Sequence, residues 1–277
     1  MKISFLVNDY MLAWNLLFQA SISESVHKLK QKLWVTYRSQ YGEMKHDYYY
    51  ILEDQKAFIP DDDTLYNYIF ESDIFLPLKK GAEKHRLYLL KLWDERKKEI
   101  NKILKELLRF EIKSEYNILV LHPVLDAVEY IPKKEITTFA IGKKEDVNDE
   151  NKALINLIYY ILKNEFANYK SEYKEIVQAV LELVINNELY TRISGESHYL
   201  EGDPTLKFLK RQIYPYWLMY MGANKADMLN YMMRDKIVFD VDKYTIETQL
   251  TKVDLYTFMD FCIKNQRYIL KINELEL

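Results

Sequence analysis

The stretch IYYILKNEFANYKSEY, residues 158–173, changes character at its centre. Its first half continues the apolar stripe of a helix predicted over about residues 150–169, a stripe made of Leu154, Leu157, Ile158 and Ile161. One turn further on, the same face carries Asn164, Glu165 and Asn168. Burial of such polar groups without partners costs on the order of 1–3 kcal/mol each, so we expect them to face a cleft or to be hydrogen-bonded.

The helix predicted to follow, over about residues 172–193, has the same arrangement. Its apolar stripe consists of Val177, Leu181 and Val184, and the next position on that stripe is Glu188. Each helix therefore ends its apolar face with polar side chains. Antiparallel packing would bring these polar ends together, which makes the two helices the first candidate for a functional site.

The charge balance excludes one class of partner. The chain has 39 Lys and Arg against 42 Asp and Glu, which is unlike the strongly basic composition of a nucleic-acid binder. Hydrophobic residues make up 49% of its 277 residues, enough for one large domain or two small ones. We therefore expect a globular protein without a nucleic-acid partner.

The compartment follows from cysteine usage and hydropathy. Cys262 is the single cysteine, so an intramolecular disulfide and a four-cysteine zinc site are both excluded. The opening MKISFLV is interrupted by Asn8 and Asp9 before it reaches the apolar length of a signal peptide. No run approaches the ~18 apolar residues that span a bilayer. These features favour a soluble, cytoplasmic protein without a membrane partner, and the abundance of Lys, Asn, Ile and Tyr suits an AT-rich bacterial genome.

Residues 1–115 are predicted to be mainly helical. Ser21 and Glu24 have capping-box spacing and indicate a helix over about residues 22–40. A longer helix over residues 83–110 has one apolar stripe and charges elsewhere, which is typical of a bundle helix.

The pattern then changes to three short runs rich in β-branched and apolar residues. They are YNILVLHP (116–123), LDAVEYI (125–131) and ITTFAIG (136–142), and they predict a small β-meander. Further helices are predicted over about residues 205–221, 224–234, 242–249 and 251–264. The predicted fold class is α+β and predominantly α-helical, with a small antiparallel or mixed sheet.

The pentad Asn-Glu-Phe-Ala-Asn resembles the His-Glu-x-x-His motif of zinc peptidases. In the thermolysin-like branch, the gluzincins, the third zinc ligand is a glutamate on the next helix, about twenty residues after the second histidine. Asn164 and Asn168 occupy the two histidine positions, Glu165 the general-base position, and Glu188 the position of the third ligand. The resemblance covers roughly residues 116–222. It implies a small sheet packed on the motif helix and a division into a helical region 1–115 and a metallopeptidase-like region 116–277.

The chain departs from the gluzincin pattern at the metal ligands. Asparagine is a poor substitute for imidazole on zinc, so we expect no cofactor, or zinc if the protein is active after all. Zinc lowers the pKa of its bound water from ~15.7 to ~7, and Glu165 alone would not replace that effect. Arg192 stands where gluzincins tend to have an aspartate that orients the first histidine. It would supply positive charge beside Glu188, or form an ordinary i,i+4 ion pair with it.

Three further residues are candidates for the same cleft. Active gluzincins use a later histidine or tyrosine to stabilise the tetrahedral intermediate, and His198 follows the Glu188 helix, although a plain loop histidine is the alternative. Tyr214 and Tyr216 surround Pro215 and would line the cleft or pack in the core.

The sequence therefore favours an inactive metallopeptidase-like protein that binds a peptide or protein partner, for example along the edge strand at residues 136–144. One alternative is a weakly metal-dependent peptidase that uses Glu165 as general base and binds the metal through Glu165, Glu188 and, as a further candidate, His198. Another is a helical interaction protein that has no peptidase relation and no sheet at 116–142.

Overall fold

The computed structural model describes residues 1–19, 23–54, 56–112, 114–131, 136–144, 148–224, 226–227, 230 and 250–266. Packing divides the chain into two compact units, each assembled from two segments. The first unit contains residues 1–97 and 113–156, and the second contains 98–112 and 157–277. This division differs from a boundary at residue 115, because the first strand of the sheet comes from the N-terminus.

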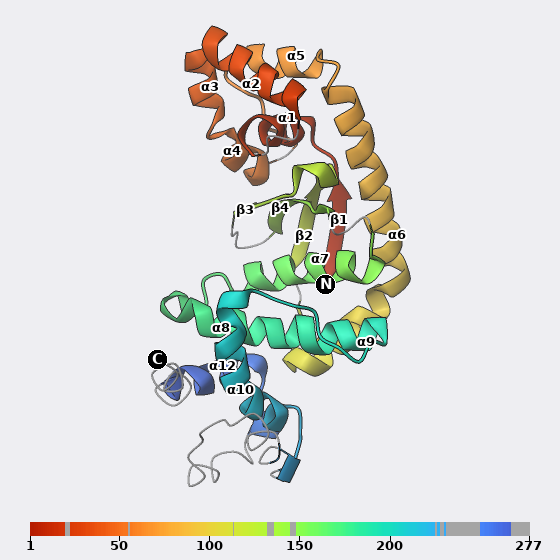
Figure 1. The fold of residues 1–277 in the computed structure, drawn as a ribbon, viewed down its shortest axis with the longest axis vertical. Helices are drawn as coiled ribbons and strands as arrows, with labels where there is room; N and C mark the ends of the chain where they lie inside the picture. The colour runs from red at the N-terminus through yellow and green to blue at the C-terminus, as the bar shows by residue number, and fades with distance from the viewer. Residues whose placement is uncertain are drawn as a thin grey trace. The chain divides into compact units, whose positions relative to one another are not determined.

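The first unit is built on a four-stranded mixed sheet (Figure 1). Its strands are β1 (Lys2–Leu6), β2 (Glu115–Val120), β3 (Ala127–Ile131) and β4 (Ile136–Gly142), in the order β1-β2-β4-β3. β2 is parallel to both β1 and β4, and β3 is antiparallel to β4. The predicted fold class is confirmed, and so are the three predicted strands. The predicted meander is wrong, because β4 lies between β2 and β3 and separates them. The predicted edge strand at residues 136–144 is wrong for the same reason, since β4 is paired on both sides.

The central strands are buried on both faces, as parallel strands require. Ile118, Leu119 and Val120 of β2 are consecutive buried residues, and so are Phe139, Ala140 and Ile141 of β4. An alternating pattern would have marked a half-exposed antiparallel strand.

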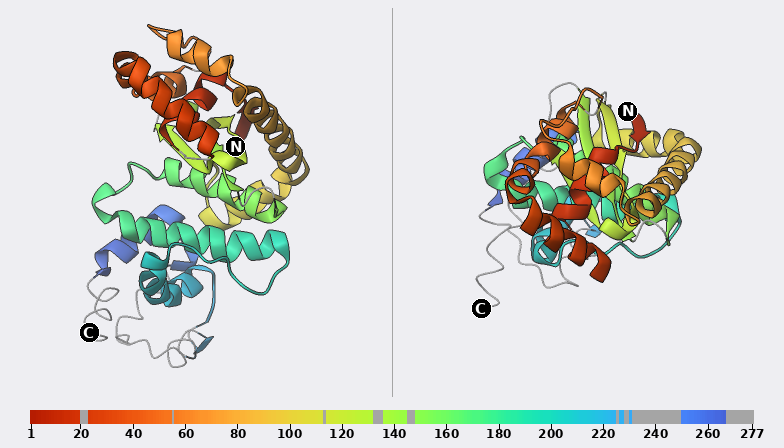
Figure 2. Two further views of the ribbon diagram at one scale, coloured as in Figure 1. Left: turned by 45° about the horizontal axis from the view of Figure 1, so that its top comes forward. Right: turned by 90° about the horizontal axis from the view of Figure 1, so that it is seen from above.

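Five helices cover one end of this sheet, and the first part of α6 passes its β1 edge (Figures 1 and 2). They are α1 (Asp9–Phe18), α2 (Glu24–Thr36), α3 (Arg38–Met44), α4 (Asp47–Glu53) and α5 (Thr64–Phe70), followed by α6 (Phe75–Leu108). Seven consecutive residues of α1, Met11 to Leu17, are buried in a core shared with Leu119 and Ala140 of the sheet.

The helix ends differ in part from the predicted ones. Ser23, not Ser21, caps α2 by accepting a hydrogen bond from the Val26 amide at 3.3 Å, and Ser21 lies outside the described residues. The chain bends at Tyr37, so the helix predicted to reach residue 40 is two helices. The long helix begins at Phe75, so Pro77 lies in its first turn. The predicted start at residue 83 is therefore about two turns too late.

The described part of the second unit consists of helices, turns and loops and contains no strand. Beside the end of α6 and α7 (Glu150–Glu165, from Leu157 on), it contains η3 (Ser171–Tyr173), α8 (Lys174–Glu182), η4 (Leu183–Leu189), α9 (Tyr190–Ser194), η5 (Pro204–Leu206), α10 (Lys207–Tyr220) and α12 (Leu255–Lys264). The segment η4 is π-helical and joins α8 to α9 without a break. Most of the helices predicted over 224–234 and 242–249 lie outside the described residues.

Arg109 ties three helix ends together within this unit. It follows α6 in the left-handed region, at φ 60°, which is unusual for a residue other than glycine. Its guanidinium donates to the carbonyls of Leu250 (2.9 Å), Val253 (2.7 Å) and Tyr220. The Tyr220 ring lies 3.9 Å from the guanidinium carbon, and its hydroxyl donates to the Leu107 carbonyl at 2.6 Å.

Cys262 is buried, and burial raises the pKa of its thiol well above the ordinary value. Within the described ranges, no helix is both long and apolar enough to cross a bilayer.

The contact between Gly81 and His122 gives a test of the first unit. A Cβ atom on Gly81 of α6 would lie 2.0 Å from the His122 ring, which is held because its Nδ1 accepts a hydrogen bond from the Val124 amide at 3.0 Å. Gly81→Ala should therefore lower the free energy of unfolding by about 1–3 kcal/mol in urea denaturation.

Gly42→Ala is the matched control, since Gly42 also lies in a helix but has nothing within 4 Å of the added atom. It should raise the free energy of unfolding by about 0.5–1 kcal/mol. Equal stabilisation by both substitutions would show that the His122 ring moves aside without cost.

Candidate functional site

The pentad resembling the zinc motif straddles the end of a helix. α7 ends at Glu165, so the helix predicted to reach residue 169 is one turn too long. Residues 166–170 form turns, which leave Asn164 buried and Asn168 exposed. A His-Glu-x-x-His motif needs both ligand positions on one face of one helix. The two amides therefore do not have the arrangement of zinc ligands.

An aromatic contact explains why α7 stops early. The Phe166 and Tyr169 rings pack on Tyr256, with centroid distances of 4.8 and 4.9 Å. The Tyr169 hydroxyl donates to Asp260 at 2.8 Å and to the Tyr256 carbonyl at 3.0 Å. Burial and the hydrogen bond to Asp260 raise the pKa of Tyr169, so it stays a donor. These contacts to α12 replace the last helical turn.

Glu188 belongs to a different set of contacts. Its carboxylate accepts a hydrogen bond from Trp217 Nε1 at 3.3 Å and pairs with Arg192 at 3.5 Å. Arg192 also pairs with Glu106 at 3.2 Å. The i,i+4 pair that the sequence offered as the ordinary role of Arg192 is thus present.

The position of Glu188 along its helix separates it from the pentad. Lys163, the residue before Asn164, lies near Lys174 at the start of α8. Burial lowers the pKa of Lys163, and the charge of Lys174 lowers that pKa further. Glu188 follows Lys174 by fourteen residues, which corresponds to roughly 20 Å along the helix axis. One metal ion holds its ligands at about 2 Å, so it would not bridge that length. This geometry argues against the predicted convergence of the Asn164 and Asn168 amides with Glu188.

The remaining predicted residues lie in three environments. His198 is exposed, with its Nδ1 3.6 Å from the Glu196 carboxylate. Tyr216 is buried with its ring 5.3 Å from that of Phe261, which is the core-packing alternative. Tyr214 lines a cavity whose described lining includes neither the pentad nor Glu188, and it shares a hydrogen bond of 2.8 Å with the Tyr199 hydroxyl.

This cavity is a candidate ligand site in the second unit. Its volume of about 750 Å³ lies within the range of ligand pockets, roughly 300–1,000 Å³. The lining residues are Leu183, Asn187, Tyr199, Lys207, Lys210, Arg211, Tyr214, Leu218, Asp227 and Asn230. They combine two leucines and two tyrosines with cationic and amide groups, a composition suited to a ligand with both apolar and polar parts.

One face of α10 supplies half of the lining. Lys207, Lys210, Arg211, Tyr214 and Leu218 recur at the three- and four-residue spacing that places side chains on one side of a helix. Three of these five are cationic, and they occupy the first turns, where the helix dipole adds positive potential. Asp227 is the one acidic residue of the lining.

Lys207 is the cation available to a ligand. It is exposed, and no carboxylate lies within ion-pairing distance of it among the described residues. Lys210 differs, because its Nζ lies 2.6 Å from the carboxylate of Glu182. The cavity therefore has a structural cation and at least one free cation.

The π-helical segment supplies two further lining residues. Asn187 is 7% exposed and lines the cavity with Leu183. Its carbonyl accepts a hydrogen bond from the Thr191 hydroxyl at 2.7 Å. The neighbouring carbonyl of Asn186 accepts from the Leu200 amide at 3.1 Å, which attaches the loop after α9. π-Helical turns occur frequently at functional sites, because the widened turn redirects side chains.

Glu182 fixes the loop and α10 around the cavity. Its side chain is 2% exposed and accepts from Lys210 and, at 2.8 Å, from the Asp203 amide. Gly202 lies so close that a Cβ atom there would come within 1.9 Å of the carboxylate. Sequence reasoning missed this residue, although a single acid within AVLELVI, residues 179–185, is a signal of a buried ion pair.

The ion pair gives a test of this construction. Lys210→Met should lower the free energy of unfolding by about 3 kcal/mol, because it leaves the buried carboxylate of Glu182 without its cation. Adding Glu182→Gln should recover most of that loss, since a neutral amide oxygen still accepts from the Asp203 amide. Urea denaturation of the single and double variants measures both effects. A Lys210→Met protein as stable as the wild type would show that solvent compensates the carboxylate.

No family model, curated protein or solved structure matches the chain. The gluzincin resemblance therefore stays a prediction.

Proposed function

We propose that this protein binds a peptide or small ligand through an anionic group, and that the cavity between α10 and the π-helical segment is the binding site. The observation that carries the proposal is Lys207, an exposed cation without a described ion-pair partner that lines a cavity of about 750 Å³. Charge-assisted hydrogen bonds to a carboxylate or phosphate are about twice as strong as neutral ones.

The rest of the lining favours a peptide. Tyr199 and Tyr214 offer aromatic faces together with hydroxyl groups, and Asn187 offers an amide, which suits alternating side chains and peptide groups. The leucines at 183 and 218 supply an apolar surface. A peptide with an acidic side chain or a free C-terminal carboxylate would satisfy all of these groups.

The lining also favours binding over catalysis. It contains no serine, cysteine or histidine, so the usual pairs of nucleophile and base are not present among its described residues. The lining offers Asp227 no second acid with which to form an acid–base pair, because the other charged lining residues are cations. We therefore assign the cavity a recognition role.

The binding role is tested with a pool of tetrapeptides presented in two forms, as free carboxylates and as C-terminal amides. Calorimetric titration should show tighter binding of the acids, and Lys207→Ala with Arg211→Ala should weaken them about tenfold or more. Lys210 is left intact because it holds Glu182.

The matched control removes two cations from the same unit at exposed positions of α6, by Lys102→Ala with Lys105→Ala. It should leave peptide affinity unchanged. Equal affinity for acids and amides, or an unaltered affinity in the Lys207 and Arg211 variant, would contradict the proposal.

Kinship with inactive gluzincins is a separate proposal, supported by the order of strand β4, helix α7 and helix α8 along the chain. It predicts that protein purified without a chelator contains far less than one equivalent of zinc, because Asn164 and Asn168 offer no imidazole. Elemental analysis by mass spectrometry measures the content. One equivalent of zinc, retained through dialysis, would instead favour the metal-dependent peptidase.

A further inference from the structure

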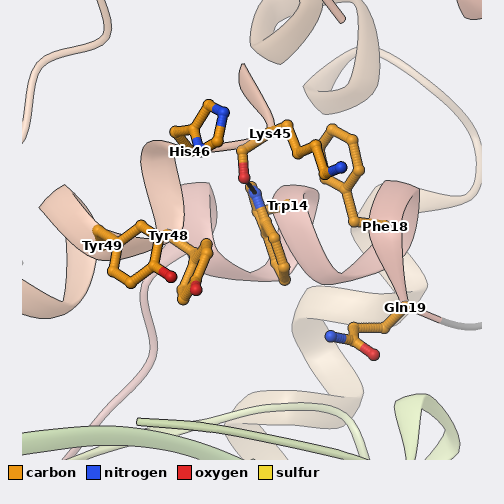
Figure 3. Close-up of a pocket in the computed structure, with 7 residues that line it drawn as sticks. All are labelled: Trp14, Phe18, Gln19, Lys45, His46, Tyr48 and Tyr49. Carbon is orange, nitrogen blue, oxygen red and sulfur yellow. Dashed lines mark hydrogen bonds between the residues drawn. The ribbon is translucent and has the colours of Figure 1, made fainter. Parts of the chain in front are cut away.

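The first unit contains a second cavity, between α1 and the bend that joins α3 to α4 (Figure 3). Its volume is about 380 Å³, near the lower end of the range for small-molecule pockets. The lining residues are Trp14, Phe18, Gln19, Lys45, His46, Tyr48 and Tyr49. None of the residues discussed for the second unit takes part, so this cavity is independent of the proposed peptide site.

Aromatic rings form the walls of this cavity. The Trp14 indole lies between the rings of Phe18 and Tyr48 (Figure 3). Its ring centroid is 5.1 Å from that of Phe18 and 4.8 Å from that of Tyr48. Tyr48 in turn lies 3.8 Å from Tyr49, which is 47% exposed. Separations of this size are those of rings in direct contact, so the rings form a continuous aromatic wall against which a further planar ring can stack. The walls therefore select a flat, aromatic ligand.

The central ring is held in place before any ligand arrives. Trp14 is 5% exposed, and its Nε1 donates to the Lys45 carbonyl at 3.2 Å. That bond also attaches the bend between α3 and α4 to α1. A preorganised wall loses little conformational entropy on binding, which favours affinity.

The charge at the rim selects the sign of the ligand. Lys45 is exposed, and no carboxylate lies within ion-pairing distance of its ammonium group in the described part of the chain. Its side chain extends beside the Phe18 ring (Figure 3). None of the seven lining residues is acidic. The Lys45 ammonium group therefore offers an anion a charged partner at this rim.

We infer that this cavity binds a small aromatic carboxylate, with its ring among Trp14, Tyr48 and Phe18 and its carboxylate at Lys45. The small volume favours a free molecule of one or two rings.

Three probes with the same ring and different charge test the inference on the full chain. They are indole-3-acetate, the neutral indole-3-ethanol and the cationic tryptamine. Saturation-transfer NMR and titration should give the order acid, alcohol, amine from tightest to weakest. Absence of binding by the acid, or tryptamine binding at least as tightly as the acid, would overturn the inference.

Variants at exposed positions separate the ring from the charge without touching the core. Lys45→Gln should weaken indole-3-acetate about fivefold and leave the alcohol unchanged. Tyr49→Ala should weaken both probes, because it removes one aromatic wall. Lys28→Gln, at a lysine that is 72% exposed on α2, is the charge-matched control. Equal affinities of the Lys45→Gln and Lys28→Gln proteins for the acid would overturn the assignment of Lys45. Peptide binding at the other cavity should be unaffected in all of these variants.

Discussion

The buried carboxylate of Glu182 is the constraint on which the second unit depends. An ionised carboxylate taken out of water costs several kcal/mol unless the protein supplies charge and hydrogen bonds in return. Here Lys210 of α10 and the Asp203 amide supply them from two different directions. Satisfying one side chain of α8 therefore fixes both α10 and the loop that precedes it.

The cavity is a consequence of that arrangement. With Lys210 drawn to Glu182, the same face of α10 presents Lys207 and Tyr214 beside the π-helical segment. The loop returns over Gly202, and its Tyr199 reaches the Tyr214 hydroxyl. The polar groups left over are the ones that a ligand can use. The ion pair that stabilises the unit and the recognition that we propose therefore use neighbouring positions of one helix, where Lys210 pairs with Glu182 and Lys207 has no described ion-pair partner.

Much of this organisation was predictable from local patterns, and the rest depended on distant contacts. The helical period located α7, α8, α10 and α12, and the β-branched runs located β2 and β4. Strand order is not encoded in such runs, because β1 pairs with β2 across more than a hundred residues. The end of α7 at Glu165 depends on Tyr256, about ninety residues later, and no feature of the pentad itself marks it.

The candidate zinc frame shows the same limit in a sharper form. A spacing of twenty residues carries geometric meaning only when the turn between two helices is known. In an antiparallel pair, residues equally distant from the turn face each other. Asn164 lies one residue before the end of α7, whereas Glu188 lies fourteen residues into the following helix, so the two are not equidistant. By contrast, the basic face of α10 lies within one helix, where the period alone fixes which side chains meet. Lys207, Arg211 and Tyr214 therefore share a surface through the helical period alone, whereas the residues of the pentad and Glu188 depend on how two helices pack.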